Sequence, residues 1–255
     1  MSRPPPRPNL RGLGLLQANV NHSPHAQDLL QQSMMERGFT LAIVSEPHRA
    51  PENSPYWAVG RERDSVAIRW RSEPGGPHTT VIERGDRHVA VQWGRIAVVG
   101  TYLRPTRRLL PFEGWLSDIG QTLIRLSPRP VLVAGDFNAW HTNWGSRRTN
   151  GRGKALARWA AMHGLVLVNE GRTPTCVRTQ GESIVDITWA TPSAMRLITR
   201  WRVEEGIETL SDHRYTYIGG VRCPLLRASP RDTTAMGPAE TPRGRPDGLD
   251  RGRLL

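Results

Sequence analysis

The chain has 255 residues, enough for one sizeable α/β domain or at most two small ones. Its formal net charge is +12 at pH 7, and Lys154 is the single lysine among 35 basic residues. This balance favours a polyanionic partner, nucleic acid before an acidic membrane. A GC-rich coding sequence would also raise arginine over lysine, but it does not explain why acidic residues fail to keep pace.

Several classes of protein are excluded at once. The two cysteines, Cys176 and Cys223, cannot form a disulfide framework, and their spacing matches no metal motif. The start "MSRPPPRPNLRG" lacks the apolar stretch of a secretory signal. No apolar run approaches the roughly 20 residues that span a bilayer. We therefore expect a soluble intracellular protein with reduced thiols and no membrane contact.

The first elements follow a Pro/Arg-rich start, residues 1–11, which we expect to be flexible. A helix is predicted from Ser23 as N-cap, through Pro24 as first helical residue, to Gly38 as the stop. Two further helices are predicted over 112–126 and 153–164. Strand signals, apolar or alternating, occupy the remaining segments: 13–20, 40–46, 65–70, 79–83, 88–93, 96–103, 130–135, 165–169, 183–190, 201–205 and 215–220.

The order of these elements indicates the architecture. Helices follow some strands, while other strands come in consecutive runs, and this mixture favours two packed sheets with helices outside over a doubly wound sheet. We predict one α/β domain over residues 12–222. Residues 223–255 have almost no apolar periodicity, so we expect a disordered low-complexity tail.

Polar residues stand at the ends of many predicted strands. A lone Asn or Asp there is usually a turn former, and "SDH" alone would more often be a solvated loop or a helix cap. Six such places in one domain are poorly explained by six independent turns. The residues concerned are Asn19, Glu46, Tyr102, Asp136, Asn138, Asp186, Ser211, Asp212 and His213.

The chemistry of this set is that of hard oxygen ligands beside one histidine. Such ligands, without a thiol cluster or paired histidines, favour Mg²⁺ or Mn²⁺ over Zn²⁺. Asp186 is placed in the middle of an apolar strand, where a carboxylate needs a partner. A metal ion, a carboxylate that orients water and a histidine held by a buried Asp can hydrolyse a phosphodiester.

The segments "QANVN", "SEPH", "TYLRP", "GDFNAWHTNWG", "SIVDITWAT" and "SDHRY" resemble, in this order, the motifs of the endonuclease/exonuclease/phosphatase superfamily. The sequence is most similar to the apurinic-type endonuclease domain of non-LTR retrotransposons, especially the arthropod elements that insert at fixed targets. The resemblance covers about residues 12–220. It implies a DNase I-like, four-layer α/β sandwich, in which two packed mixed β-sheets carry helices on their outer faces.

The resemblance also implies roles for the metal site and the attacking water. Glu46 would be the direct metal ligand, with Asn19 at the metal and Asp212 completing the surroundings of the metal and the histidine. Asp136 would orient and deprotonate the water. Asn138 would position the water and a phosphoryl oxygen. The implied cofactor is Mg²⁺, with Mn²⁺ as an alternative.

Roles around the scissile phosphate follow in the same way. His213 would donate a hydrogen bond to the phosphate, and Asp186 would hold the imidazole ring of His213. Tyr102 would contact the phosphate or stabilise the leaving oxygen. Trp144 and Gly145 would have a structural role in the loop. His141 is ambiguous, because it either supports this loop or touches DNA.

Two basic runs are candidates for binding the DNA backbone. "RPTRR" contains Arg104, Arg107 and Arg108, and "GSRRTNGRGK" contains Arg147 and Arg148. A solvated basic loop is the alternative for both runs. In one departure from the retrotransposon pattern, Asn21 and His22 stand where relatives commonly carry a basic residue.

Three functions are carried forward. The first is a Mg²⁺-dependent endonuclease that nicks double-stranded DNA and leaves a 3′-OH for reverse transcription, in the nucleus or elsewhere in the cell. The second is a phosphatase or phosphodiesterase of the same fold acting on a small phosphate ester. The third is a catalytically idle DNA-binding remnant. A full element would continue into a reverse transcriptase, so we expect an excised domain, a degraded copy or a gene fragment.

Overall fold

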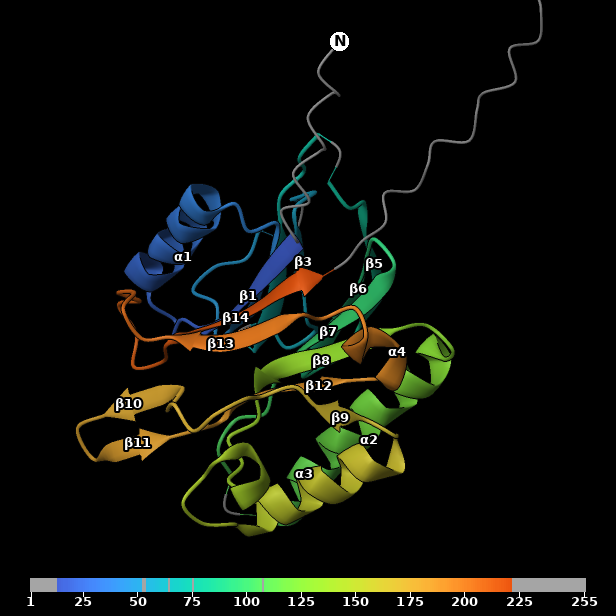
Figure 1. Ribbon diagram of the computed structural model, residues 1–255, viewed down its shortest axis with the longest axis vertical. Coiled ribbons are helices and arrows are strands. Elements are labelled where there is room, and N and C mark those ends of the chain that lie inside the picture. The colour runs from blue at the N-terminus through green and yellow to red at the C-terminus, as the bar shows by residue number, and fades with distance from the viewer. Residues whose placement is uncertain (1–12, 52–53, 64, 75, 107, 222–255) are drawn as a thin grey trace, which may run out of the picture. The chain divides into compact units, whose positions relative to one another are not determined.

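A computed structural model of the chain describes residues 13–51, 54–63, 65–74, 76–106 and 108–221 (Figure 1). The chain divides into two compact units, Met1–Leu225 and Leu226–Leu255, and the second lies outside the described residues. The segments predicted as loose ends, 1–11 and 223–255, lie outside them too. No helix in the described part of the chain is long and apolar enough to cross a membrane.

Two mixed six-stranded sheets form the centre of the first unit. The first sheet has the order β13-β14-β1-β2-β4-β3, and the second has the order β5-β6-β7-β8-β12-β9. The strands of the first sheet are β1 (Leu13–Asn19), β2 (Leu41–Ser45), β3 (Trp57–Val59), β4 (Val66–Trp70), β13 (Arg200–Glu204) and β14 (Tyr215–Val221). The strands of the second sheet are β5 (Thr79–Arg84), β6 (His88–Trp93), β7 (Ile96–Tyr102), β8 (Val131–Asp136), β9 (Val166–Leu167) and β12 (Asp186–Ala190). Within each sheet one central pair is parallel, β1 with β2 and β7 with β8.

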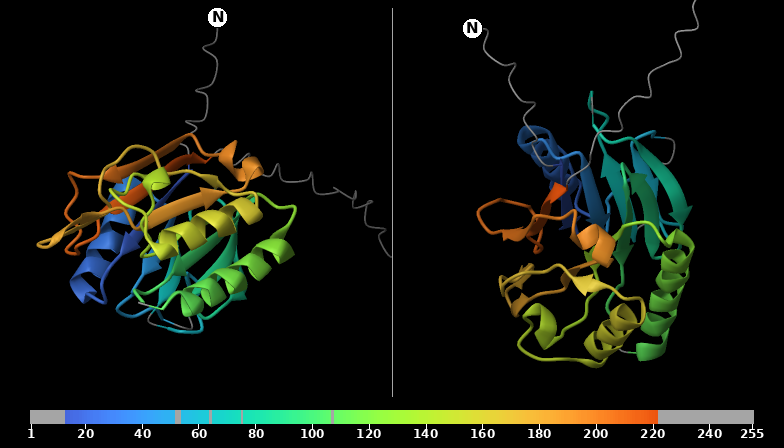
Figure 2. Two further views of the ribbon diagram at one scale, coloured as in Figure 1. Left: turned by 90° about the horizontal axis from the view of Figure 1, so that it is seen from below. Right: turned by 45° about the vertical axis from the view of Figure 1, so that its right-hand side comes forward.

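Helices cover the outer face of each sheet (Figures 1 and 2). Helix α1 (Pro24–Arg37) packs on the first sheet, and α2 (Leu109–Leu126) and α3 (Gly151–Met162) pack on the second. Short α4 (Pro192–Met195) follows β12, and the 3₁₀ turn η1 (Thr142–Trp144) follows β8. The predicted four-layer sandwich is confirmed.

Side-chain alternation along the strands explains how three apolar interfaces arise. Leu15 of β1 and Leu132 of β8 belong to the cluster between the sheets. Their neighbours Leu16 and Val133 face outward, against the helix layers. Because both faces of these strands are covered, the strands are mostly apolar, as the sequence indicated.

The helix boundaries follow local capping chemistry. The Ser23 side chain accepts from the Ala26 backbone N–H, and Gly38 ends α1 in the left-handed region at φ 72°, as predicted. Helix α2 begins at Leu109, three residues before the apolar periodicity indicated. Helix α3 begins at Gly151, after the side chain of Asn150 caps the Gly153 N–H.

The sequence missed some elements around β12. A separate hairpin, β10 (Cys176–Arg178) with β11 (Gly181–Ser183), extends beside the second sheet (Figure 1). The expectation that Asp186 lies mid-strand was wrong, because β12 begins at Asp186. Ile184 and Val185 precede the strand, although they are buried like strand residues.

One glycine is fixed by close packing of the two parallel strands in the second sheet. A Cβ on Gly135 would lie 1.8 Å from the backbone oxygen of Thr101. Only glycine allows this approach of β8 to β7. The glycine before Asp136 therefore serves the backbone that delivers this carboxylate.

Candidate active site

Strand register brings the predicted polar residues together at one edge of the sandwich. In the second sheet Tyr102 of β7 lies opposite Asp136 of β8, and Asp136 lies opposite Asp186 of β12. In the first sheet Asn19 ends β1 and Glu46 directly follows β2. The ends of five strands in two sheets thus contribute to one site.

Asn19 connects the two carboxylates at the centre. Its Nδ2 donates to Glu46 Oε2 at 2.8 Å and to Asp136 Oδ2 at 3.1 Å. Its Oδ1 accepts from the backbone N–H of Asn21 at 2.8 Å. The hydroxyl of Tyr102 donates to Glu46 Oε1 at 2.6 Å. Asn19 is therefore a bridging donor in this arrangement, and its place at the metal stays a prediction.

Asn138 holds Asp136 from the following loop. Its backbone N–H donates to Asp136 Oδ1 at 2.9 Å and its Nδ2 to Oδ2 at 3.0 Å. Both Asn138, at φ 47°, and Glu46, at φ 49°, have left-handed backbones. This conformation is strained for glutamate, and such strain is commonly found at functional sites.

His213 and Asp186 form the second half of the site. The Nδ1 of His213 donates to Asp186 Oδ2 at 2.8 Å. Asp186 Oδ1 accepts from Gln17 Nε2 at 3.2 Å, and the Asp186 N–H donates to Thr175 Oγ1 at 3.1 Å. His213 Nε2 lies 3.9 Å from Asp136 Oδ2, so one imidazole separates two buried carboxylates.

Burial and charge shift the pKa values of this group. Burial and the negative charge of Asp186 raise the pKa of Asp136 to about 7. Burial lowers the pKa of His213, but the charge and hydrogen bond of Asp186 outweigh it and raise this pKa well above its usual value. Burial and the hydrogen bond to Glu46 raise the pKa of Tyr102, so its phenol remains protonated.

Asp212 lies on the hairpin side of the histidine. Its Oδ1 is 4.0 Å from His213 Nε2, and its Oδ2 accepts from Arg178 Nε. The Sγ of Cys176 lies 4.0 Å from the same Oδ2. Among the described residues no hydrogen bond joins Asp212 to Glu46.

The oxygen-rich donors suit a hard divalent cation. Glu46 is partly exposed, and Asp136 is buried with amide groups as its hydrogen-bond donors. Burial and the charge of Asp186 raise the pKa of Asp136, so a cation near these two carboxylates would stabilise their ionised forms. Glu46, Asp136 and Asp212 offer the carboxylate oxygens that Mg²⁺ prefers.

Four of the five predicted DNA-contacting arginines are exposed on the loops that follow β7 and η1. Arg104 and Arg108 are exposed after β7, whereas Arg107 lies outside the described residues. Arg147 and Arg148 are exposed after η1, and the Arg148 guanidinium lies 4.6 Å from the ring centroid of Trp140. Exposure permits DNA contact but does not test it, so DNA binding by the four described arginines stays a prediction.

His141 supports the loop after β8. Its Nδ1 accepts from the backbone N–H of Asn143 at 3.0 Å, and its ring centroid lies 5.1 Å from that of buried Trp144. The Trp144 indole in turn donates to the Ala139 carbonyl. The ring of His141 is half-buried, so DNA contact by His141 stays a separate prediction.

Arg152 differs from the other arginines of the "GSRRTNGRGK" run. It is buried and donates to the backbone carbonyls of Leu103, Arg104 and Phe137, at 2.8–2.9 Å. Burial lowers its pKa to about 10, so it remains charged near neutral pH. Arg152 ties the loops after β7 and β8 together and is not part of a basic surface.

Sequence reasoning missed several supporting residues. Gln17 could have been found, because it is a polar residue inside the apolar segment "LGLLQAN". Cys176 and Arg178 lie in a hairpin that was not predicted, Thr175 directly precedes it, and nothing in the sequence marked the three as site residues.

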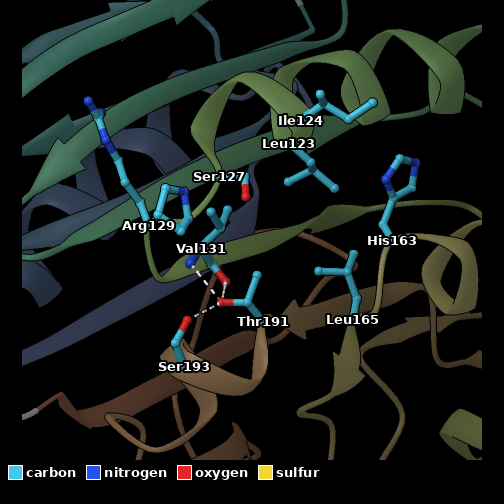
Figure 3. Close-up of a pocket in the computed structure, with 10 residues that line it drawn as sticks. Leu123, Ile124, Ser127, Arg129, Val131, His163, Leu165, Thr191 and Ser193 are labelled. Carbon is cyan, nitrogen blue, oxygen red and sulfur yellow. Dashed lines mark hydrogen bonds between the residues drawn. The ribbon is translucent and has the colours of Figure 1, made fainter.

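Two cavities among the described residues lie away from the predicted site residues. One of about 290 Å³ opens at the start of β8, between Val131, His163 and Thr191 (Figure 3). Thr191 Oγ1 accepts there from the Val131 N–H. None of the predicted site residues lines this cavity, so we assign no chemistry to it.

Comparisons with known proteins agree with the motifs. The family model described as endonuclease-reverse transcriptase matches residues 96–217. The RNA-directed DNA polymerase from mobile element jockey of Drosophila melanogaster is 29% identical over 121 residues, which are 46% of this chain. The match spans only 12% of the length of that relative.

Solved structures show the same fold. The endonuclease domain of TRAS1, a telomere-specific non-LTR retrotransposon, has a TM-score of 0.71 at 24% identity, covering 83% of this chain and 99% of that one. The AP endonuclease LMAP from Leishmania major has a TM-score of 0.66 at 13% identity, covering 84% and 89%. The 3′ phosphatase NExo from Neisseria, bound to a product DNA hairpin, has a TM-score of 0.61 at 15% identity, covering 81% and 98%. The chain thus shares the fold of these three proteins, and its residues 96–217 are similar to the family described as endonuclease-reverse transcriptase.

Proposed function

We propose that the chain is a Mg²⁺-dependent endonuclease that nicks double-stranded DNA and leaves a 3′-OH able to prime reverse transcription. The observation that carries the proposal is the 3.9 Å separation of Asp136 Oδ2 and His213 Nε2. A carboxylate and a proton donor thus face one another, beside the Asn19–Glu46–Tyr102 network.

Asp136 acts on the attacking water. Asn19 and Asn138 each donate a hydrogen bond to Oδ2 of Asp136, and these two bonds restrict the motion of the carboxylate. The water oxygen forms a bond to phosphorus, and Asp136 accepts the proton that the water loses. Asn138 lies beside this carboxylate, where its amide can orient both the water and the phosphate.

His213 acts on the phosphate itself. Asp186 holds the imidazole through Nδ1, which directs Nε2 toward the position of a phosphoryl oxygen. A donated hydrogen bond there offsets the charge that grows during the reaction. The bond from phosphorus to the 3′ oxygen breaks, and the leaving oxygen takes its proton from solvent. The products are a 5′-phosphate and a 3′-OH.

The metal is assigned to the acidic side of the site. Glu46 is proposed as its direct ligand, with Asn19 and Asp212 as further candidates, and Mn²⁺ as an alternative ion. When bound, the cation supplies positive charge that stabilises the phosphoryl oxygens. Tyr102, whose phenol donates a hydrogen bond to Glu46, is proposed to contact the phosphate.

Double-stranded DNA is the proposed substrate, and the exposed arginines near the site support this assignment. The jockey relative is an RNA-directed DNA polymerase, so we propose that a reverse transcriptase of the parent element uses the nick. The proposed place of action is the nucleus, where target DNA lies.

The test is incubation of the full chain with supercoiled plasmid, with Mg²⁺ or with EDTA. We expect relaxed circles only with Mg²⁺, and a loss of at least about 10²-fold in rate for Asp136→Ala. DNA polymerase should extend the nicks without prior treatment if they carry a 3′-OH. The same-fold alternative predicts phosphate release from a small ester by a protein that leaves plasmid intact. A chain that binds DNA and cleaves neither substrate would be an idle remnant.

A further inference from the structure

Cys176, Asp212 and His213 form a compact group of potential metal ligands at the base of the β10–β11 hairpin. Their ligand atoms all lie within 4.8 Å of one another. Cys176 Sγ is 4.0 Å from one oxygen of Asp212, and His213 Nε2 is 4.0 Å from the other. Cys176 and His213 are also partners in an isolated antiparallel β-bridge, which fixes their backbones side by side. The proposed hydrolysis has no use for the thiol.

The separations are close to those of a tetrahedral site. Zinc binds cysteine sulfur at about 2.3 Å and histidine nitrogen or carboxylate oxygen at about 2.0–2.2 Å, which places ligand atoms about 3.4–3.8 Å apart. The side chains of this group therefore need to approach one another by up to about 1 Å to bind one ion. Asp212 is 23% exposed, and it opens the group to solvent.

The histidine is already oriented for such a role. Its Nδ1 is bonded to Asp186 at 2.8 Å, and Asp186 is itself held by Gln17 and Thr175. A carboxylate bonded to one ring nitrogen directs the other nitrogen at a metal and strengthens it as a ligand. The structure therefore holds a metal-binding histidine, its outer carboxylate and a neighbouring thiol.

We propose that Cys176, Asp212 and His213 bind one thiophilic divalent cation, Zn²⁺, and that its binding inhibits nicking. Thiolate and imidazole ligands select such an ion over Mg²⁺, which prefers the oxygens of Glu46 and Asp136. Binding releases the thiol proton of Cys176 and the Nε2 proton of His213 to solvent. His213 then has no proton to offer the phosphate. The inhibition rests on the proposed function, whereas the binding does not.

Binding is measured without any nuclease assay. The full chain carrying Cys223→Ser keeps Cys176 as its only thiol, so an ultraviolet sulfur-to-metal band on titration with Cd²⁺ reports this site. We expect saturation at one ion per chain, and a Zn²⁺ affinity that falls at least about 10-fold in Cys223→Ser/Cys176→Ser. A missing band, or equal Zn²⁺ affinities in the two proteins, would overturn the proposal.

Inhibition is measured by adding Zn²⁺ to plasmid nicking at a fixed excess of Mg²⁺. Each rate is divided by that of the same protein without Zn²⁺. We expect strong inhibition of Cys223→Ser and at least about 10-fold less sensitivity after Cys176→Ser is added. Equal sensitivity would overturn the inhibitory role even if the Cd²⁺ band appears. If neither protein nicks DNA with Mg²⁺, the proposed function fails, while the Cd²⁺ titration still decides the binding site.

Discussion

The imidazole Nδ1 of His213 lies 2.8 Å from Asp186 Oδ2, although the two residues are 27 positions apart in the chain. Both side chains are 2% exposed. In such surroundings the carboxylate fixes the tautomer of the ring and stabilises its protonated form. The pair therefore acts as one unit, and its members should not contribute independently to nicking.

Substitutions in this pair test that dependence. Asp186→Asn and His213→Ala should each reduce the nicking rate at least about 10²-fold, because each removes the oriented proton donor. The double variant should be no slower than His213→Ala, since one function has already been lost. Nicking rates of all four proteins at saturating Mg²⁺ make up the cycle. Additive losses would show that the two side chains act separately.

The left-handed backbone of Glu46 provides a second test. Its φ is 49°, a region that costs an ordinary residue about 1–2 kcal/mol and that asparagine tolerates better. Both Glu46→Asn and Glu46→Ala should abolish nicking, because the proposed metal ligand is gone. Glu46→Asn should nevertheless be about 1 kcal/mol more stable than Glu46→Ala in denaturant unfolding. Equal unfolding free energies would argue against strain at this position.

Local signals in the sequence were enough to predict most of the fold. The Ser23 cap, the Gly38 stop and the apolar strands depend on neighbours in the chain, and the structure has them all. The convergence of Asn19 and Asp136 also followed, because strand ends carry side chains to one edge of a sheet.

Long-range support could not be predicted in this way. Gln17 bonds Asp186 across 169 positions, and nothing near either residue encodes the other. Arg148 and Arg152 stand in the same basic run, yet one lies over half-buried Trp140 and the other is buried against Phe112. Helix packing decides between these outcomes, and composition does not show it.

Arg152 should therefore be a structural residue. Arg152→Ala leaves the carbonyls of Leu103 and Phe137 without a buried donor, which should cost about 2 kcal/mol or more. Arg158→Ala is the matched control, because Arg158 lies on the same helix but is 71% exposed, and it should change stability by at most about 0.5 kcal/mol. Denaturant unfolding compares the two. A mild effect of Arg152→Ala would argue against a structural role for this residue.

His88 predicts a pH dependence of stability away from the site. Its ring is buried, with Nε2 2.8 Å from Thr122 Oγ1, and burial lowers its pKa. Charged groups around it are Glu83, Asp86, Asp118 and Arg125. Because the pKa of His88 in the folded chain lies below the unfolded value of about 6.5, the unfolded chain binds more protons at pH values between the two. The folded state therefore loses stability as the pH falls through this range.

The matched variant is His88→Gln, which can still bond Thr122 but does not titrate. Unfolding free energies at pH 7.5 and at pH 5.5, measured for both proteins, give two differences. Wild type should lose more stability between these pH values than His88→Gln. An equal loss would assign the acid sensitivity to other groups.

The last prediction concerns how DNA is bound. Arg147 and Arg148 are exposed on the loop that follows η1, and if they contact backbone phosphates, log K should fall with log salt by roughly 0.9 for each phosphate neutralised. Arg147→Ala/Arg148→Ala should flatten this slope by about one to two units and weaken binding to all duplexes alike.

The control is Arg95→Ala/Arg129→Ala, which removes the same charge. Both of its arginines are exposed at the starts of β7 and β8, opposite the ends that carry Tyr102 and Asp136. Titrations of the three proteins at several salt concentrations, on two unrelated duplexes, separate local contact from net charge. Arginines that read base edges would instead lose affinity mainly on one duplex, by roughly 1–3 kcal/mol per contact. If both double variants flatten the slope equally, net charge explains DNA binding and the loop after η1 makes no specific phosphate contact.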